Sequence, residues 1–219
     1  MDNYIDFHTH KQSAPDGVIT VYNQLLHEET HIPKHFYSAG LHPWHADKLS
    51  NADLSRVLDL HGINSNFIAL GETGLDKVCK IPTQIQQDIF ELQLNKAVIL
   101  SKPVIIHCVK AWEEMLEITN HYHVPMILHG YNGSDQLTVK LVKRGFFFSI
   151  GPMILNPNTR IGHAIRYIPI SSIFCETDES DQPIQSVYNA VCDYLKMKET
   201  DFRRIVMENF VRLRKECET

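Results

Sequence analysis

Val104-Ile105-Ile106-His107 is an unbroken apolar run that ends at a histidine, and Met126-Ile127-Leu128-His129 repeats this pattern further along the chain. Continuous rather than alternating apolarity is typical of strands that are covered on both faces, as in a parallel sheet. Parallel strands need long crossover connections, which are usually helices. These two stretches therefore predict an α/β chain, in which buried strands alternate with helices.

Short runs rich in β-branched and aromatic residues recur along the rest of the chain, and stretches with helical spacing separate them. The eight predicted strands are Tyr4–Phe7, Val18–Tyr22, Phe36–Leu41, Phe67–Leu70, Val104–Ile106, Met126–Leu128, Phe146–Ile150 and Ile173–Cys175. The predicted helices are Thr83–Leu100, Trp112–Thr119, Asp135–Lys143, Thr159–Tyr167, Gln185–Lys196 and Phe202–Lys215. This alternation favours a TIM-type (β/α) barrel.

The barrel is shortened at its first crossover. With 219 residues the chain suits one domain, residues 1–219, but is short for eight complete β/α units. The segment between His10 and Val18 is too short for a helix and contains Pro15 and Gly17. We therefore expect a loop in place of the first crossover helix, and one short helix around 25–33 in the second crossover.

Composition narrows the class of protein. The net charge of -5 argues against a broad basic face that coats nucleic acid, although one local phosphate site remains compatible with it. No apolar run approaches bilayer length and the first residues lack the features of a signal peptide, so a cytoplasmic protein without a membrane partner is expected. The five cysteines are odd in number and form no Cys-x-x-Cys pair, which disfavours a disulfide framework or a thiolate zinc site. No obligate protein partner is predicted.

Histidines and acidic residues stand at the ends of the predicted strands. They are His8 and His10 after the first strand, His42 after the third, Glu72 after the fourth, His107 after the fifth, His129 after the sixth and Asp178 after the eighth. A single histidine at a strand end is usually a hydrogen-bonded or solvent-facing residue. In a (β/α) barrel, however, the carboxyl ends of all strands meet at one mouth. Repetition of the pattern on several strands therefore predicts a metal site.

The motifs around these residues have a consistent order along the chain. They are Asp6-x-His8-x-His10, Gly40-Leu41-His42-Pro43-Trp44, Gly71-Glu72-Thr73-Gly74-Leu75-Asp76, Pro103-Val104-Ile105-Ile106-His107, Leu128-His129-Gly130, Phe148-Ser149-Ile150-Gly151, Glu176-Thr177-Asp178 and Asn209-Phe210. In their number, order and spacing the chain resembles the TatD family of metal-dependent deoxyribonucleases, within the wider amidohydrolase superfamily.

The resemblance implies a site for two divalent cations, which are Zn, Mn or Mg. The ligands that it implies are His8, His10, Glu72, His107, His129 and Asp178. One cation would be held by His8, His10 and Asp178, the other by His107 and His129, with Glu72 as the bridge between them. Mixed imidazole and carboxylate ligands suit Zn or Mn, and the sequence does not choose among these ions.

The resemblance also implies catalytic and substrate-binding roles. Asp178, Glu72 and His42 would be catalytic, with Asp178 accepting a proton from the attacking water and His42 close to the scissile group. His42, Trp44 and Lys110 are the candidate substrate contacts. Trp44 can stack on a base or simply cover the barrel mouth, and the two readings have equal weight. Many relatives carry an arginine two residues after the fifth-strand histidine, where this chain has Val109 followed by Lys110. Lys110 can substitute, but lysine lacks the bidentate fork of arginine.

Three functions compete at this stage. A divalent-metal phosphodiesterase that acts on DNA ends or another phosphate ester is favoured, because two cations can activate water for in-line displacement. The segment from Ile68 to Asp76 contains no lysine, whereas many amide-hydrolysing relatives bridge their metals with a carbamylated lysine. The alternative is a metal-dependent amidohydrolase or esterase that acts on a small molecule or an aminoacyl substrate. A degenerate barrel without catalysis is the third.

Several other polar residues are expected to have structural rather than catalytic roles. We expect Asp76 to stabilise the loop that follows the fourth strand. Cys108 is expected to be a buried small apolar residue rather than a nucleophile. Four histidines in helix or pre-strand positions are expected to face solvent, and these are His27, His31, His35 and His61.

Overall fold

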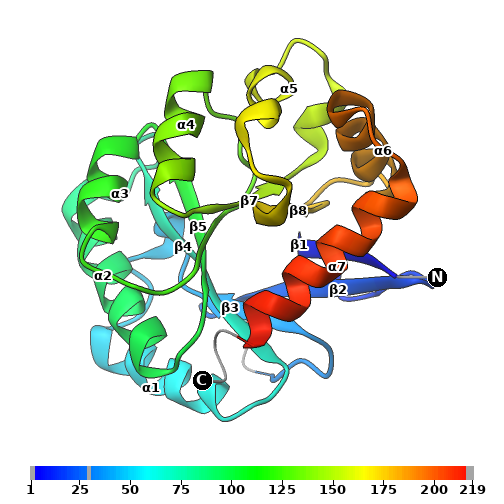
Figure 1. The fold of residues 1–219 in the computed structure, drawn as a ribbon. Helices are drawn as coiled ribbons and strands as arrows, with labels where there is room; N and C mark the ends of the chain where they lie inside the picture. Colours follow the sequence, from blue (N-terminus) through cyan, green and yellow to red (C-terminus); the bar gives the residue numbers. More distant parts are fainter. Residues whose placement is uncertain (1–2, 29–30, 216–219) are drawn as a thin grey trace. The chain divides into compact units, whose positions relative to one another are not determined.

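The computed structural model describes residues 3–28 and 31–215 (Figure 1). Its eight strands follow one another in the sheet in chain order, from β1 to β8, and helices connect most of them. Sequential parallel strands with helical crossovers are the topology of a TIM-type (β/α) barrel, as predicted. Two compact units divide the chain: the first contains residues 3–22 and 127–215, and the second contains residues 23–28 and 31–126.

The elements are close to those predicted. The strands are β1 Tyr4–Thr9, β2 Val18–Leu25, β3 Tyr37–Gly40, β4 Phe67–Asp76, β5 Val104–Val109, β6 Met126–Leu128, β7 Phe147–Ile150 and β8 Ile173–Cys175. The α-helices are α1 Asn51–Gly62, α2 Thr83–Ile99, α3 Trp112–Thr119, α4 Asp135–Lys143, α5 Arg160–Ala164, α6 Ile184–Leu195 and α7 Glu199–Lys215. The 3-10 helices are η1 Pro43–His45, η2 Pro152–Leu155, η3 Ile165–Tyr167 and η4 Ile170–Ser172. Among the described residues, no helix has both the length and the apolar content needed to cross a bilayer.

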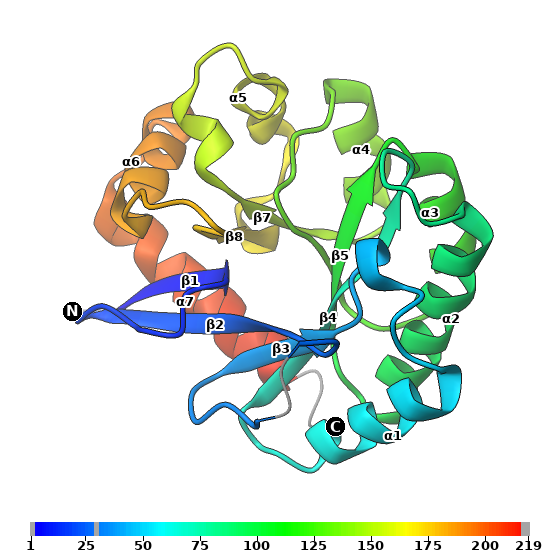
Figure 2. The same cartoon turned by 180° about the vertical axis from the view of Figure 1, so that it is seen from behind.

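The first unit contains the parallel pairs β1 with β2 and β7 with β8, and α6 and α7 lie against β1 (Figure 2). In its core the ring of Phe7 stacks on that of Phe174 at 4.1 Å between centroids. The hydroxyl of Tyr188 on α6 accepts from the amide of Ile5 and donates to its carbonyl, each at 3.1 Å. This hydrogen-bond pair connects α6 to the start of β1, the strand that leads to His8.

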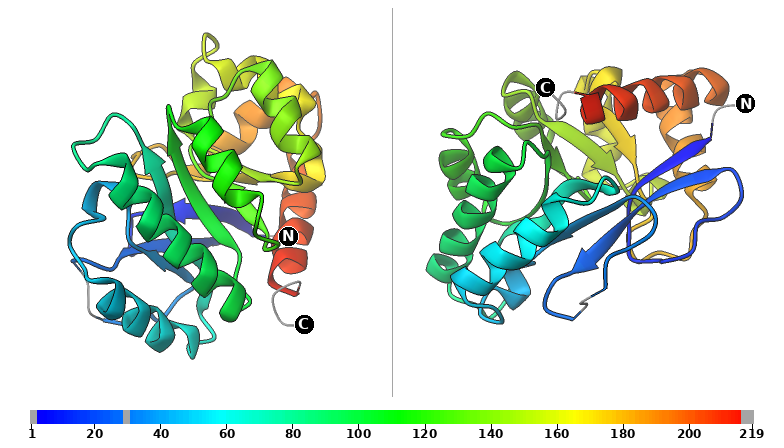
Figure 3. Two further views of the ribbon diagram at one scale, coloured as in Figure 1. Left: turned by 90° about the vertical axis from the view of Figure 1, so that its left-hand side faces the viewer. Right: turned by 90° about the horizontal axis from the view of Figure 1, so that it is seen from below.

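The second unit contains the parallel strands β3, β4 and β5, with α2 packed on β4 (Figure 3). All ten residues of β4 are buried. Gly71 and Gly74 have positive φ, and a Cβ on either would lie 2.4 and 2.0 Å from the carbonyl oxygens of Ile105 and His107 respectively. Glycine at these two positions therefore permits the close approach of β4 and β5.

The connections contain one confirmed and one wrong prediction. The first crossover is a loop, as predicted, because no helix lies between β1 and β2. The short helix predicted around 25–33 is wrong for the described part of that segment, since β2 continues to Leu25 and a turn follows. Residues 29 and 30 of the predicted helix lie outside the described residues. Beyond the predicted end at Tyr22 the strand continues through the buried polar residues Asn23 and Gln24, which no apolar pattern marks.

Helix α1 was not predicted, although its start signal is present. The hydroxyl of Ser50 accepts from the amide of Asp53, which is a typical N-cap. The predicted helix at 159–167 forms two short helices instead, α5 and η3. Neither difference affects a candidate ligand, because none of the candidate ligands belongs to α1, α5 or η3.

Candidate metal centre

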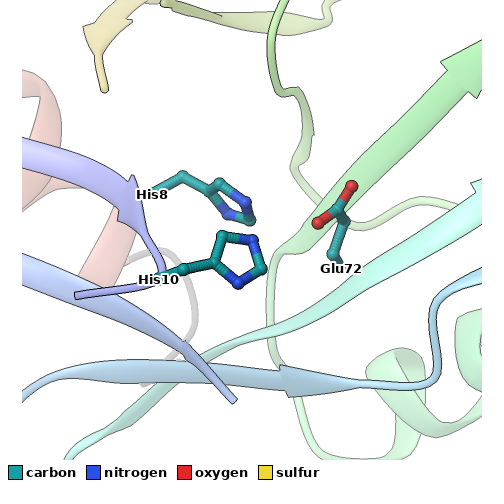
Figure 4. Close-up of side chains that lie close together, drawn as sticks. All are labelled: His8, His10 and Glu72. Atoms are coloured by element: carbon teal, nitrogen blue, oxygen red, sulfur yellow. The ribbon is translucent and has the colours of Figure 1, made fainter. Parts of the chain in front are cut away.

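The first unit brings together four of the predicted ligands. One donor atom from each of His8, His129 and Asp178 lies within 4.8 Å of the others. The Asp178 Oδ1 atom lies 3.4 Å from His10 Nε2 and 3.8 Å from His8 Nε2. Figure 4 shows the two imidazoles side by side at the end of β1. Mixed imidazole and carboxylate donors at these separations fit a divalent transition-metal ion.

The local backbone explains how His8 and Asp178 meet. Strand β1 has a bulge between Asp6 and Thr9, and a bulge re-aims the side chains that it contains, here including His8. Asp178 has a left-handed φ of 53° and donates its amide to the His8 carbonyl at 2.9 Å. Its own carbonyl accepts from the His10 amide at 3.3 Å. The segment after β8 is thus hydrogen-bonded to the end of β1.

Asp6 strengthens the same junction without being a predicted ligand. Its two carboxylate oxygens accept from the amide and the hydroxyl of Thr177, at 2.8 and 2.7 Å. Burial raises the pKa of Asp6 to about 6, although the donors on Thr177 act in the opposite direction. Asp6 therefore positions Thr177 and, with it, the adjacent Asp178.

Glu176 is a functional candidate that sequence reasoning missed. Its side chain is fully buried. The Oε1 atom accepts from the amide of Gly130 at 2.6 Å and lies 3.4 Å from His129 Nδ1. A carboxylate behind a metal-binding imidazole orients the ring and raises its basicity. The available signal was an acidic residue directly after an apolar strand, which is costly to bury without a partner.

The second unit brings together Glu72, His107 and His42. Glu72 is 4% exposed, and its Oε1 atom lies 2.8 Å from His107 Nδ1 and 3.3 Å from His42 Nε2. One donor atom from each of these residues lies within 4.8 Å of the others. Glu72 lies inside β4 rather than after it, at a bulge between Leu70 and Thr73. As in β1, the bulge is positioned to re-aim a candidate ligand.

Asn23 on β2 is a second residue that sequence reasoning missed. Its side-chain amide donates to Glu72 Oε2 at 3.3 Å, and its Oδ1 atom accepts from the Glu72 amide at 3.1 Å. The hydroxyl of Ser38 also donates to that oxygen at 3.2 Å. Asn23 thus holds both the backbone and the carboxylate of Glu72, and no motif in the sequence marks it.

The partners of the two ring nitrogens of His42 indicate which of them carries the proton. The amide of Trp44 donates to His42 Nδ1 at 3.1 Å. In the neutral ring the proton is then on Nε2, which faces Glu72. A protonated Nε2 is a hydrogen-bond donor and not a metal ligand, so this arrangement directs the N–H of His42 to Glu72.

Asp76 connects the cluster to the neighbouring loop. Its Oδ1 atom accepts from the amide of Val78 at 2.7 Å, so that it stabilises the loop as expected. Its Oδ2 atom accepts from Trp44 Nε1 at 2.7 Å and lies 3.2 Å from His107 Nε2. Burial disfavours the ionised form of Asp76, but the three N–H donors outweigh it and hold its pKa below the usual range.

The remaining predicted site residues occupy different settings. Lys110 follows β5 with a left-handed φ of 55° and is exposed. Trp44 belongs to η1 and is 55% exposed. The structure groups His129 with His8 and Asp178, whereas it groups His107 with Glu72 and His42. The implied pairing of His107 with His129, and the bridging role of Glu72, join residues of both units and stay predictions.

Burial corrects two expectations about other histidines. His61 was expected to face solvent but is 5% exposed, and its Nδ1 atom lies 2.9 Å from the Tyr37 hydroxyl. Burial lowers the pKa of His61. The side chain of His27 is 9% exposed and stacks on His45 at 3.6 Å between ring centroids.

Burial raises the pKa of the Cys108 thiol to about 12, which agrees with the expectation that this thiol is not a nucleophile.

Comparisons with known proteins agree on one family. Residues 19–215 match the model of the TatD related DNase family. The chain is 31% identical over 192 residues to an uncharacterized metal-dependent hydrolase of Buchnera aphidicola, covering 78% of this chain and 72% of that protein. It is 31% identical over 163 residues to the human 3'-5' RNA nuclease TATDN2, covering 71% of this chain but 21% of that protein.

A solved structure agrees with the fold. The crystal structure of YjjV, a TatD homologue from Escherichia coli K12, superposes with a TM-score of 0.84 at 21% identity and covers 97% of this chain and 98% of that chain. At this identity the likeness concerns the fold, and it supports the (β/α)-barrel assignment. With the family match over most of its length, the chain belongs to the TatD related DNase family and is a metal-dependent hydrolase.

Proposed function

We propose that this protein hydrolyses phosphodiester bonds at the ends of nucleic acid strands. The observation that carries the proposal is the buried Glu72 carboxylate, which faces two imidazoles of its own unit at 2.8 and 3.3 Å. A buried carboxylate among imidazoles is costly unless a cation or protons compensate its charge. The name of the human relative, a 3'-5' RNA nuclease, supports a nucleic acid substrate.

Each unit would supply ligands for a divalent cation. In the first unit these are His8, His10, His129 and Asp178, and in the second unit Glu72 and His107. Two bound cations would supply positive charge that activates water and stabilises a phosphate undergoing in-line displacement. Glu176 and Asp76 would orient His129 and His107 through the ring nitrogens that they face.

Other side chains would move the proton and hold the substrate. The carboxylate of Asp178 is 37% exposed, so that water can reach it, and it would accept the proton of the attacking water. His42, whose ring lies beside Glu72, would lie close to the scissile group of the substrate. Lys110, which is exposed, would add positive charge for the phosphate backbone.

End-labelled single-stranded DNA and RNA test the proposal. The purified protein is expected to release nucleotides when Mg or Mn is added, and Glu72→Ala and His107→Ala are expected to abolish the release. His121→Ala is the matched control, because it removes an exposed imidazole. Normal turnover by either ligand variant would defeat the proposal, and labels on either end would show the polarity of digestion.

This chain has Val109 followed by Lys110 where many relatives carry an arginine at position 109, and this difference favours one alternative function. A weaker phosphate anchor is compatible with a metal-dependent esterase or amidohydrolase that acts on a small molecule or an aminoacyl substrate. A panel of such esters and amides distinguishes the two functions. Turnover of the panel without turnover of DNA or RNA would favour the alternative.

A further inference from the structure

Trp44 is exposed yet held in place by hydrogen bonds. The residue is 55% exposed, while its ring N–H donates to Asp76 Oδ2 at 2.7 Å. Its backbone amide donates to His42 Nδ1 at 3.1 Å. An exposed tryptophan normally loses side-chain entropy when a ligand immobilises it. Here the indole N–H bond already holds the ring, and the amide bond holds the backbone that carries it.

Asp76 is well suited to hold this ring. The carboxylate is 3% exposed and accepts N–H groups from the Trp44 ring and the Val78 backbone, each at 2.7 Å. One carboxylate therefore holds both the Trp44 ring and the backbone of the loop after β4.

The indole also has apolar surface available. The rings of His42 and His107 meet it at 90° and 77°, at centroid distances of 5.1 and 6.4 Å, and no other ring of the described chain contacts Trp44. No parallel ring therefore stacks on the indole. Val78, whose amide is bound by the same carboxylate, is 62% exposed. Trp44 and Val78 are thus exposed apolar residues that both donate an N–H group to one buried carboxylate.

We propose that Trp44 is a preorganised stacking surface for an unpaired nucleobase, and that Asp76 is the positioning residue that fixes its ring. The proposal rests on the proposed function for its choice of nucleic acid as ligand. Because every base has a π-face, such a surface binds single strands without sequence preference. The ring lies beside His42 and His107, so that a stacked base would place its phosphate near the cluster of the second unit.

Tryptophan fluorescence tests stacking without cations or turnover. The chain has two tryptophans, so the variant Trp112→Phe leaves Trp44 as the only indole. In the presence of a chelator, thymidine 5′-monophosphate is expected to quench this fluorescence, whereas ribose 5-phosphate is not. Equal quenching by both probes, or none by the nucleotide, would overturn the proposal. Absence of hydrolysis would instead count against the proposed function alone.

Oligonucleotide binding by Trp44 variants distinguishes the role of the aromatic ring from the role of its N–H group. Trp44→Ala is expected to weaken binding of a short single strand by roughly 5- to 150-fold, which is the range for loss of one stacked base. Trp44→Phe keeps an aromatic face and should weaken it less. Strands that lack the base at the 3′ or the 5′ end provide the control. The strand that lacks the stacked base should bind both variants and the wild type equally. Equal loss for all strands would contradict base stacking.

Asp76→Asn tests the positioning role. An amide presents donor hydrogens where the carboxylate accepts, so that it cannot accept from both Trp44 and Val78. In the Trp112→Phe background, this change is expected to lower the fluorescence anisotropy of Trp44 and to weaken nucleotide quenching. Unchanged anisotropy in a folded variant would remove Asp76 from the proposal. If the variant does not fold, the comparison of Trp44→Phe with Trp44→Ala still decides the role of the ring.

Discussion

The two clusters of candidate ligands differ in how deeply their carboxylates are buried. Glu72 in the second unit is 4% exposed, and Asn23 binds both its backbone and its side chain. The Asp178 side chain in the first unit is 37% exposed and is positioned by its backbone, through hydrogen bonds to His8 and His10. The comparison indicates that the side chain of Glu72 is more closely tied to the packed interior of its unit than the side chain of Asp178 is.

The clusters also share two devices. A bulge in the ligand-bearing strand contains His8 in one unit and Glu72 in the other. A carboxylate stands behind one imidazole in each unit: Glu176 faces His129, and Asp76 faces His107. The same physical solution therefore occurs twice, and the differences in burial can be tested against this common background.

The largest expected effect comes from neutralising either ligand carboxylate. Glu72→Gln and Asp178→Asn should each lower kcat/KM by more than about 100-fold, beyond the range for residues that only orient ligands. Metal analysis of the purified variants should show fewer bound cations than the wild type. If one of the two variants keeps a tenth or more of the activity, its cluster is not needed for the reaction.

A smaller effect is expected from the residues behind the ligands. Asn23→Ala in the second unit and Glu176→Gln in the first should each weaken Mn²⁺ binding by about 10- to 100-fold. Isothermal titration with Mn²⁺ alone measures this without a substrate. Wild-type affinity in both variants would show that the hydrogen bonds to Glu72 and the carboxylate near His129 do not position ligands.

Stability is expected to depend on one buried polar side chain in each unit. Gln93 binds the amide and the carbonyl of Leu41 and also contacts Thr73, whereas Tyr188 binds only the two backbone groups of Ile5. Tyr188→Phe should lower the free energy of unfolding by about 1–3 kcal/mol, because it leaves buried backbone groups unpaired.

Gln93→Met should cost more than Tyr188→Phe, since three partners lose their hydrogen bonds instead of two. Urea unfolding measures both changes. A reversed order would mean that the loop before η1 rearranges more easily than the start of β1.

The smallest expected effect is the change in the free energy of unfolding that Asp178→Asn causes in the absence of cations. Asparagine tolerates the left-handed backbone of Asp178, and the side chain is partly exposed, so that the free energy of unfolding should change by less than about 0.5 kcal/mol. Glu72→Gln should cost about 1–3 kcal/mol because it disturbs buried hydrogen bonds. Thermal unfolding in a chelator compares the two variants, and equal stabilities would contradict the difference in burial.

The amino-acid sequence by itself determined the fold class and the candidate ligands. Unbroken apolar runs such as Val104-Ile105-Ile106 encode buried parallel strands, and the short segment after His10 excludes a helix, because both features are local. The family motifs then pointed to the residues at the strand ends. Helix α1 was missed although Ser50 marks its start and Leu54, Val57 and Leu58 follow the helical period.

Only the tertiary structure decided which residues support the ligands. Asn23 and Glu72 are 49 residues apart in the chain, and Glu176 and Gly130 are 46 apart, so that no local pattern relates them. The burial of His61 likewise depends on Tyr37, a residue of another element. Hydrogen bonds between distant residues form only after the strands are packed, whereas strand and helix periodicities are already present in the unfolded chain.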